Sequence, residues 1–105
     1  MLNMTTYQVK RKDREAILEV QGHANYSGYG TDIVCASIST ALIFTANLIE
    51  KLNLSYNIID LVCEEGYFRL QIKTTDLIAN AIFENLEYTL EEISKQYPKN
   101  LKYIN

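Results

Sequence analysis

The spacing of hydrophobic and polar residues changes along the chain and predicts strands alternating with helices. Residues 4–10 and 16–22 are rich in β-branched and aromatic side chains and flank the charged residues 11–14, which predicts a β-hairpin. Residues 56–63 and 67–73 flank Glu64, Glu65 and Gly66 and predict a second hairpin. In the second strand we expect Leu18 and Val20 to face the core, because they alternate with more polar positions.

Helical spacing follows each predicted hairpin. After the first, it begins at Asp32, and the expected buried stripe is Val34, Ile38, Ala41, Leu42, Thr45, Ile49 and Leu52. After the second, Thr75 or Asp76 can cap a helix that Pro98 ends, with a stripe of Ile78, Ile82, Leu86, Leu90, Ile93 and Tyr97. Residues 101–104 predict a last short strand. Ile33, Phe44 and Leu48 lie off the first stripe, which favours a buried helix or one that packs against a second subunit.

The order ββαββαβ predicts a single domain over residues 1–105, of the α+β class, with one small sheet and two helices. A chain of 105 residues that is 48% hydrophobic can bury a core without disulfides. The net charge of -3 makes phosphate backbones and anionic membranes poor partners. Serine, threonine and asparagine interrupt the apolar residues 33–49, and the N-terminus lacks a signal-like apolar run, so we expect no membrane span and a soluble cytoplasmic protein.

Candidate chemistry lies in the segment 22–39. His23, the only histidine, follows a predicted strand, and Cys35 lies near the start of a predicted helix. If Asp32 is the N-cap, Cys35 is the third helical residue, where free N–H groups and the helix dipole favour a thiolate. A folded loop could bring His23 beside Cys35 as a base. From the residues alone, both side chains could instead have packing roles.

The second cysteine has a different setting. Cys63 lies in a predicted strand without a helix terminus, so we expect it to be structural and both thiols to be reduced. One histidine and two separated cysteines fall short of a structural zinc set, so no metal site is predicted.

The segment GHANYSGYGTDIVCASIS resembles the ribosomal-processing cysteine proteases of the Prp (YsxB-like) family. The family pattern is a GHA triplet, here at 22–24, a glycine-bearing loop, and GxDIVCAxxS, here at 30–39. The resemblance implies an endopeptidase with Cys35 as nucleophile and His23 as base, without metal or organic cofactor. It implies that the peptide substrate is a short N-terminal extension of large-subunit ribosomal protein twenty-seven. It also implies a homodimer and a flexible loop over the active site; direct nucleic-acid binding is not required.

Several neighbouring residues have two possible roles. Asp32 could cap the helix or orient His23, and capping is the simpler role. Ser39 could brace the site or donate a hydrogen bond to the carbonyl of Cys35, one turn earlier. The residues expected to form a substrate lid, with a solvent-facing loop as the alternative, are Tyr26, Gly28, Tyr29 and Gly30.

Two other functions fit the same residues. One is a non-catalytic ribosome-assembly or ribosome-associated binding module that keeps Cys35 as a packing residue. The other is a thiol-dependent acyl transferase. Fast alkylation of Cys35 would argue against the binding module, and the reaction products would separate hydrolysis from transfer. The acidic residues Glu84, Glu87 and Glu91 and the basic residues of the first turn are expected to be solvated surface.

Overall fold

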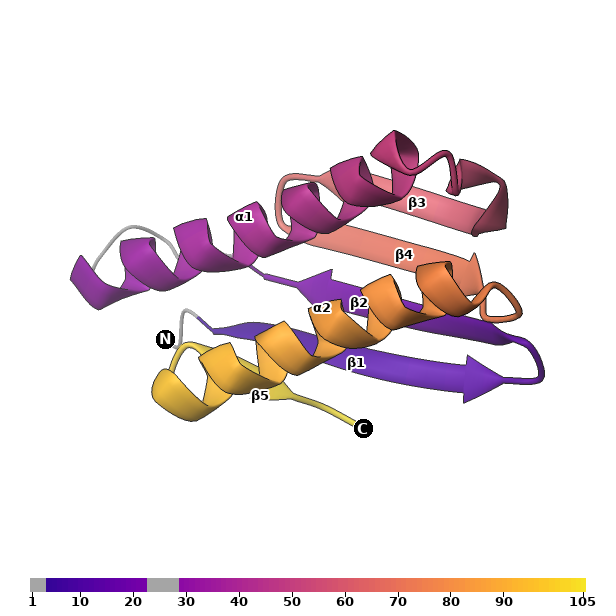
Figure 1. Cartoon of the computed structure of the whole chain (residues 1–105). Helices are drawn as coiled ribbons and strands as arrows, with labels where there is room; N and C mark the ends of the chain where they lie inside the picture. The colour runs from indigo at the N-terminus through magenta and orange to yellow at the C-terminus, as the bar shows by residue number, and fades with distance from the viewer. Residues whose placement is uncertain (1–3, 23–28) are drawn as a thin grey trace.

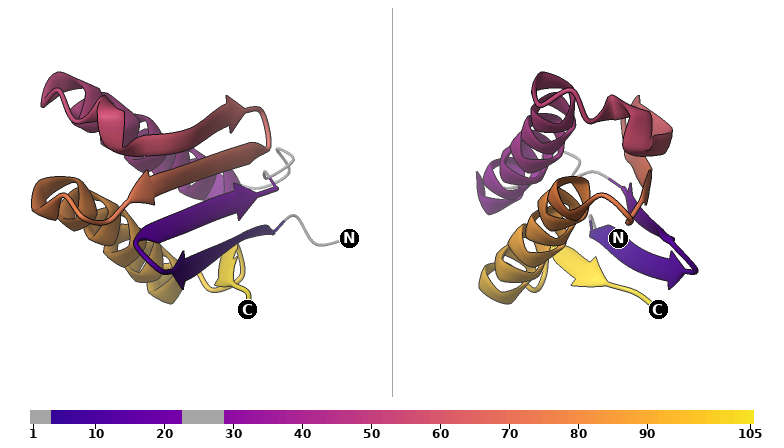
Figure 2. Two further views of the ribbon diagram at one scale, coloured as in Figure 1. Left: turned by 90° about the vertical axis from the view of Figure 1, so that its right-hand side faces the viewer. Right: turned by 45° about the vertical axis from the view of Figure 1, so that its right-hand side comes forward.

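A five-stranded sheet with both helices on one face forms the domain, and no helix of the described residues covers the other face (Figures 1 and 2). The computed structural model describes residues 4–22 and 29–105. The elements are β1 (Thr5–Lys12), β2 (Glu15–Gln21), α1 (Tyr29–Lys51), the 3₁₀ turn η1 (Ser55–Asn57), β3 (Ile58–Glu64), β4 (Tyr67–Lys73), α2 (Leu77–Gln96) and β5 (Leu101–Tyr103). The predicted α+β class and the order ββαββαβ are confirmed.

The strand order β3-β4-β2-β1-β5 joins the two hairpins edge to edge. β2 pairs antiparallel with β4, so Gln21 lies opposite Tyr67, while β1 runs parallel to β5. The pairing brings the end of β2 beside the β3–β4 turn, and the Gly22 N–H donates a 2.9 Å hydrogen bond to the Gly66 carbonyl. The segment that precedes His23 is therefore anchored against the second hairpin.

The core lies between the sheet and the helices. As predicted, Leu18 and Val20 are buried. The largest fully buried side chains are Phe83, Leu18, Ile49, Leu70, Ile72, Leu86, Leu90, Leu101 and Val34. Both helices contribute to this set, so each is held on the sheet by burial of apolar surface.

The predicted burial is wrong for two residues of the helical stripes. Leu52 lies beyond the end of α1 and is 48% exposed, and Ile78 is 59% exposed. In α2, Ala79 and Phe83 take the core positions instead. Asp76 is the N-cap, as one of the two expected residues, because its carboxylate accepts hydrogen bonds from the N–H groups of Ile78 and Ala79. This cap sets the rotation of the first turn and leaves Ile78 outside.

Residues Ile33–Lys51 are long and apolar enough to cross a membrane, with a mean hydropathy of 1.7. By length and composition alone, the expectation that this stretch is too polar was therefore wrong. In the fold, however, its stripe of Val34, Ile38, Leu42 and Ile49 is buried in the core. One face of the helix is thus part of the core, while only 28% of the stretch as a whole is buried.

The outer face of the sheet carries a polar network centred on Glu19. The Tyr67 hydroxyl donates a 2.5 Å hydrogen bond to Glu19 Oε2, and Arg69 Nη1 lies 3.2 Å from the same oxygen. Arg69 also contacts Asp60 on β3, at 3.0 Å. The hydrogen bond from Tyr67, together with the charge of Arg69, lowers the pKa of the Glu19 carboxyl.

This shift predicts an acid-dependent loss of stability. Because the folded-state pKa lies below the unfolded value, near 4.5, the contribution is complete above that value and is lost as pH falls through the folded pKa. We expect Glu19→Gln to flatten the decline in unfolding free energy between about pH 5 and pH 3, measured by urea denaturation at each pH. Glu65→Gln, on an exposed turn, is the matched control. An unchanged slope in Glu19→Gln would contradict the assignment.

Candidate active site

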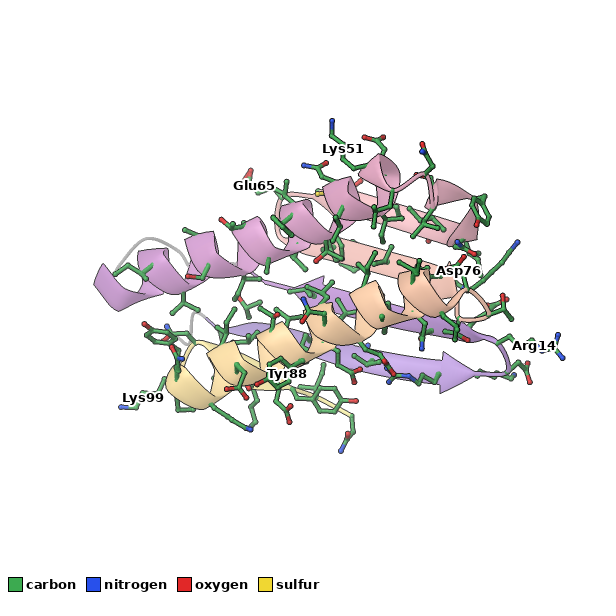
Figure 3. All side chains as sticks on the ribbon, viewed as in Figure 1. Arg14, Lys51, Glu65, Asp76, Tyr88 and Lys99 are labelled. Atoms are coloured by element: carbon green, nitrogen blue, oxygen red, sulfur yellow. The ribbon has the colours of Figure 1, made fainter. Side chains whose placement is uncertain are left out.

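A pocket of about 240 Å³ lies between α1 and the ends of the strands that face it. Its helix wall contains Cys35, Ile38, Ser39, Leu42 and Ile43. Its sheet wall contains Thr5, Val20, Gly22, Cys63, Glu64, Gly66, Tyr67 and Phe68. In Figure 3, the Glu65 turn at this end of the sheet is far from Asp76 and Arg14, which lie at the opposite end. The pocket is mostly apolar and brings together segments that are distant in sequence.

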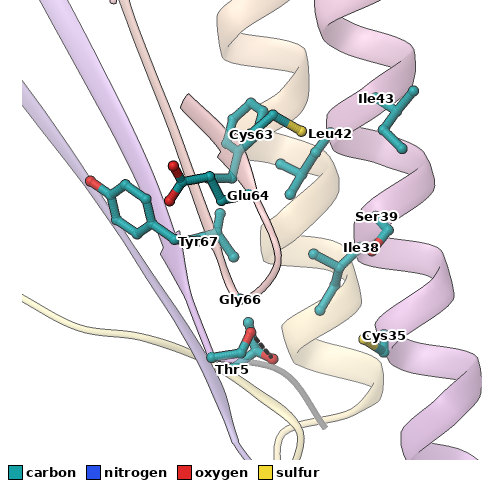
Figure 4. Close-up of a pocket in the computed structure, with 13 residues that line it drawn as sticks. Thr5, Cys35, Ile38, Ser39, Leu42, Ile43, Cys63, Glu64, Gly66 and Tyr67 are labelled. Carbon is teal, nitrogen blue, oxygen red and sulfur yellow. Dashed lines mark hydrogen bonds between the residues drawn. The ribbon is translucent and has the colours of Figure 1, made fainter. Parts of the chain in front are cut away.

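Cys35 is half-buried in the helix wall, with its sulfur on the side of α1 that faces the sheet (Figure 4). The predicted helix start is wrong, because α1 begins at Tyr29 rather than after Asp32. Counted from Tyr29, Cys35 is the seventh helical residue and not the third. The N–H groups without an intrahelical partner lie in the first helical turn, and the dipole effect also fades within that turn. The helix start therefore contributes less to thiol activation at Cys35 than the sequence predicted, and the N–H of Cys35 itself is not a free oxyanion donor.

Ser39 lies one turn after Cys35 and lines the same pocket (Figure 4). The expected alternative, a hydrogen bond from Ser39 to the Cys35 carbonyl, is not found among the described residues. Ser37 makes the equivalent bond instead, donating to the Ile33 carbonyl at 2.8 Å. Ser39 is exposed, and it places a polar group in a mostly apolar pocket wall.

Cys63 also lines the pocket, which the sequence analysis did not predict. It is exposed at the end of β3, with its sulfur directed toward α1 (Figure 4), while its expected structural role stays a prediction. Both thiols are free, as expected. The predicted turn at residues 64–66 was the available signal. This turn lies beside the end of β2, and α1 follows β2 in the chain, so the end of β3 also lies near α1.

The other predicted site residues divide into two groups. Tyr29 and Gly30 belong to the first turn of α1, so the prediction that they lie in a lid loop was wrong; the helix simply starts earlier than Asp32. Asp32 lies inside the helix and is not its N-cap, and its side chain lies outside the described part of the structure. The remaining predictions, for His23, Tyr26 and Gly28, also fall outside the described residues.

Gly22 shapes the end of β2 directly before His23 in the sequence. Its φ of 95° lies in the region that favours glycine, and an added Cβ would lie only 2.7 Å from the Met4 carbonyl oxygen. Thr5 Oγ1 donates a hydrogen bond to the Gly22 carbonyl at 3.4 Å. The path of the chain out of β2, in the pocket wall, thus depends on glycine at this position.

We expect Gly22→Ala to destabilise the fold by about 2 kcal/mol, through positive φ and the contact with Met4. Because the strand end must shift, peptidase activity should fall more than the loss of folded protein explains. Urea denaturation and peptide cleavage at a matched folded concentration measure the two effects. Gly66→Asn is the control, since asparagine tolerates the positive φ of that turn. A Gly22→Ala protein with full stability and full activity would contradict this role.

The described geometry is that of a site for thiol chemistry. A half-buried thiol faces an apolar pocket of a size that can accept a side chain of a peptide, with a hydroxyl one turn away. Among residues 4–22 and 29–105, no cluster of three or more histidine, cysteine or acidic side chains could hold a metal ion.

Comparison with known proteins agrees with this class. The sequence matches the family described as "Cysteine protease Prp" over residues 4–102. The chain therefore belongs to the Prp family of cysteine proteases. A curated relative, the ribosomal processing cysteine protease Prp of Staphylococcus aureus, is 28% identical over 102 residues that cover 94% of this chain and 96% of the relative.

Two solved structures of the S. aureus protease share the fold. The complex with a substrate peptide superimposes with a TM-score of 0.81 at 25% identity, covering 96% of this chain and 98% of that one. The complex with a covalently linked product peptide gives a TM-score of 0.77 at 28% identity, covering 96% and 100%. Family membership sets aside the alternative of a non-catalytic binding module: the chain is a cysteine protease.

Proposed function

We propose that this protease uses Cys35 as its nucleophile and His23 as its general base to remove an N-terminal extension from large-subunit ribosomal protein twenty-seven. The observation that carries the proposal is the half-buried Cys35 thiol in the wall of an apolar pocket. Cys63, the other thiol of the pocket, lies on an exposed strand end and is not followed by the family's CAxxS pattern.

The role of His23 is supported by the path of the chain before it. Gly22 lines the pocket together with Cys35 and is tied to Gly66 and Thr5 by hydrogen bonds. His23 is the next residue and the only imidazole in the chain. An imidazole suits the role of base because its charge changes near neutral pH, and His23 directly follows the pocket residue Gly22 in the chain.

The reaction then follows the chemistry of the pair. His23 accepts the Cys35 proton, and the thiolate attacks the scissile carbonyl carbon to form a tetrahedral intermediate. The imidazolium donates its proton to the departing amine as the C–N bond breaks and a thioester remains. Water, deprotonated by His23, hydrolyses the thioester and releases the thiol. The hydroxyls of Thr5 and Tyr67, which also line the pocket, donate to Gly22 and Glu19, so Ser39 is our candidate for a side-chain hydrogen bond to the oxyanion.

The substrate assignment is supported by the relative from S. aureus, which is named a ribosomal processing protease, and by the peptides bound in its solved structures. The apolar pocket suits an apolar side chain beside the scissile bond. A substrate made on cytoplasmic ribosomes also fits our expectation of a cytoplasmic enzyme.

The test is incubation with the host's full-length ribosomal protein twenty-seven, followed by mass spectrometry of the products. We expect one cut near the N-terminus, with water as the acceptor, and loss of that cut in His23→Ala. Transfer of the peptide to an added amine in preference to water would instead indicate an acyl transferase. A wild-type enzyme that leaves the protein intact, or a fully active His23→Ala variant, would contradict the proposal.

We also propose that the protein is a homodimer that buries the apolar outer surface of its helices. Phe44 on α1 and Leu77 and Ile78 on α2 are 66%, 84% and 59% exposed, and all three line a groove of about 320 Å³ between the helices. Projecting side chains beside a groove can fit into the same groove of a two-fold related copy. Such a surface is unusual on a monomer.

Sedimentation equilibrium at micromolar concentration tests the dimer. We expect the wild type to sediment as a dimer, and Leu77→Ser combined with Phe44→Ser to sediment as a monomer with unchanged secondary structure. Ile104→Ser, an exposed apolar residue after β5, is the control. A monomeric wild type would contradict the proposal.

A further inference from the structure

The strand β3 forms an open edge of the sheet that ends at the active-site pocket. In the strand order β3-β4-β2-β1-β5, β4 is its one neighbouring strand, and Figure 2 shows β3 as the outermost strand. An edge strand presents unpaired N–H and C=O groups and can accept another extended chain. Cys63 and Glu64, the last two residues of β3, line the pocket with Cys35.

This edge is irregular at the end remote from the pocket. Bulges interrupt the pairing of edge strands, and the β3–β4 register shifts between Ile58 and Asp60. From Asp60 to Glu64 the pairing is regular, and it runs up to the pocket. The regularly paired part of the edge, which carries the carboxylates of Asp60 and Glu64, is therefore the part nearest Cys35.

Apolar side chains line the same part of the edge. Leu61 and Cys63 pair with Leu70 and Phe68, which are buried under the helices, so all four side chains lie on the helix-covered face. Leu61 is nevertheless 42% exposed, and Cys63 is also exposed. The polar contact of β3 lies elsewhere, where Asp60 accepts a 3.0 Å bond from Arg69 on the outer face. An added strand would thus meet apolar side chains on one face and polar ones on the other.

We propose that the substrate binds as an additional β-strand along β3, with its scissile bond in the pocket beside Cys35 and apolar side chains at alternate positions over Leu61. The partner is an extended peptide, since main-chain hydrogen bonds give affinity in this mode and alternate side chains give specificity. The two-residue turn at Glu65 and Gly66 makes Glu64 and Tyr67 the closing pair of the hairpin. Alternation then predicts that Leu61 and Cys63 turn their main-chain groups outward to the peptide.

The inference rests on the proposed substrate, and amide hydrogen exchange tests it. The probe is a synthetic peptide spanning the N-terminal extension and cleavage site of ribosomal protein twenty-seven, bound to Cys35→Ala so that it is not cut. We expect NMR-detected exchange at Leu61 and Cys63 to slow at least tenfold on binding. Exchange at Val62 and Glu64, whose amides face β4, should change less than twofold. A bound peptide that leaves Leu61 and Cys63 unprotected would overturn the inference.

Backbone N-methylation of the same peptide gives a second readout. Methylation at every second residue should raise Kd at least tenfold, and methylation at the residues between should change it less than threefold. Leu61→Ala should raise KM severalfold, with Ile104→Ala, after β5, as a matched control for loss of an exposed apolar side chain. An N-methyl scan without this alternation would contradict strand pairing.

The outcomes separate this inference from the proposed function. If the peptide is cleaved and β3 stays unprotected, the substrate assignment stands and the strand-pairing mode fails. If the peptide neither binds nor is cleaved, the substrate assignment fails. If Leu61 and Cys63 are protected in the free protein and lose protection on dilution, a second copy occupies the edge, and the inference is wrong.

Discussion

Replacing Cys35 with alanine is expected to lower kcat/KM for peptide cleavage by about 10⁴- to 10⁶-fold, because it removes the sulfur that we propose as the nucleophile. The change should leave the fold intact, since Cys35 is only half-buried and alanine is a good helix former. Steady-state kinetics with a fluorogenic peptide, together with circular dichroism, measure both quantities.

Cys63→Ala is the matched control for this experiment. It removes the second thiol of the same pocket, and it should keep kcat within a few-fold while changing KM modestly, because Cys63 lies beside the bound peptide in our account. Full activity in Cys35→Ala combined with an inactive Cys63→Ala would reverse the assignment of the two thiols.

Phe83→Ala is expected to destabilise the fold by about 3–5 kcal/mol, the largest loss of stability that we predict for a single substitution. Phe83 is fully buried on α2, and the Arg11 guanidinium lies 5.6 Å from its ring centre. Arg11 also forms a 2.6 Å ion pair with Glu87 on the same helix. The substitution therefore leaves a cavity and loosens the anchoring of α2 to β1.

Urea denaturation followed by circular dichroism measures this effect. Tyr88→Ala, at an exposed position on the same helix, is the control and should change the unfolding free energy by less than about 1 kcal/mol. A Phe83→Ala protein as stable as the Tyr88→Ala protein would show that this residue does not anchor the core.

The element order was predictable from the sequence because each element has a strong local signal. The alternation around Leu18 and Val20, the turn at Gly66 and the cap at Asp76 each follow from short-range chemistry. Pairing between strands that are distant in sequence has no such signal. The β2–β4 register, which brings Gly22 beside Gly66, depends on how the two hairpins bury their faces together.

The start of α1 was mispredicted for a physical reason. Gly30 and Thr31 have low helix propensity, and Asp32 is a favoured N-cap residue, so local preference puts the boundary at Asp32. The helix nevertheless begins at Tyr29. The error affected the site, because it placed Cys35 in the first turn and assigned to the dipole an activation that our proposal gives to His23.

The candidate site was predictable only in part. Cys35 and Ser39 share a helix face because they are four residues apart, and the structure brings both into the pocket. The sheet wall was not predictable, since Cys63 and Tyr67 reach the pocket through the pairing of β2 with β4. The sequence identifies the residues of a motif, whereas long-range pairing decides which other residues meet them.

Covalent trapping tests the central claim, that Cys35 is the attacking nucleophile, most directly. The enzyme is treated with a vinyl sulfone built on the substrate peptide, digested, and mapped by mass spectrometry. We predict one peptide adduct per chain, on Cys35, formed at a rate that falls at least 100-fold in His23→Ala. An adduct on Cys63 with Cys35 unmodified, or no adduct under conditions of active cleavage, would contradict the account.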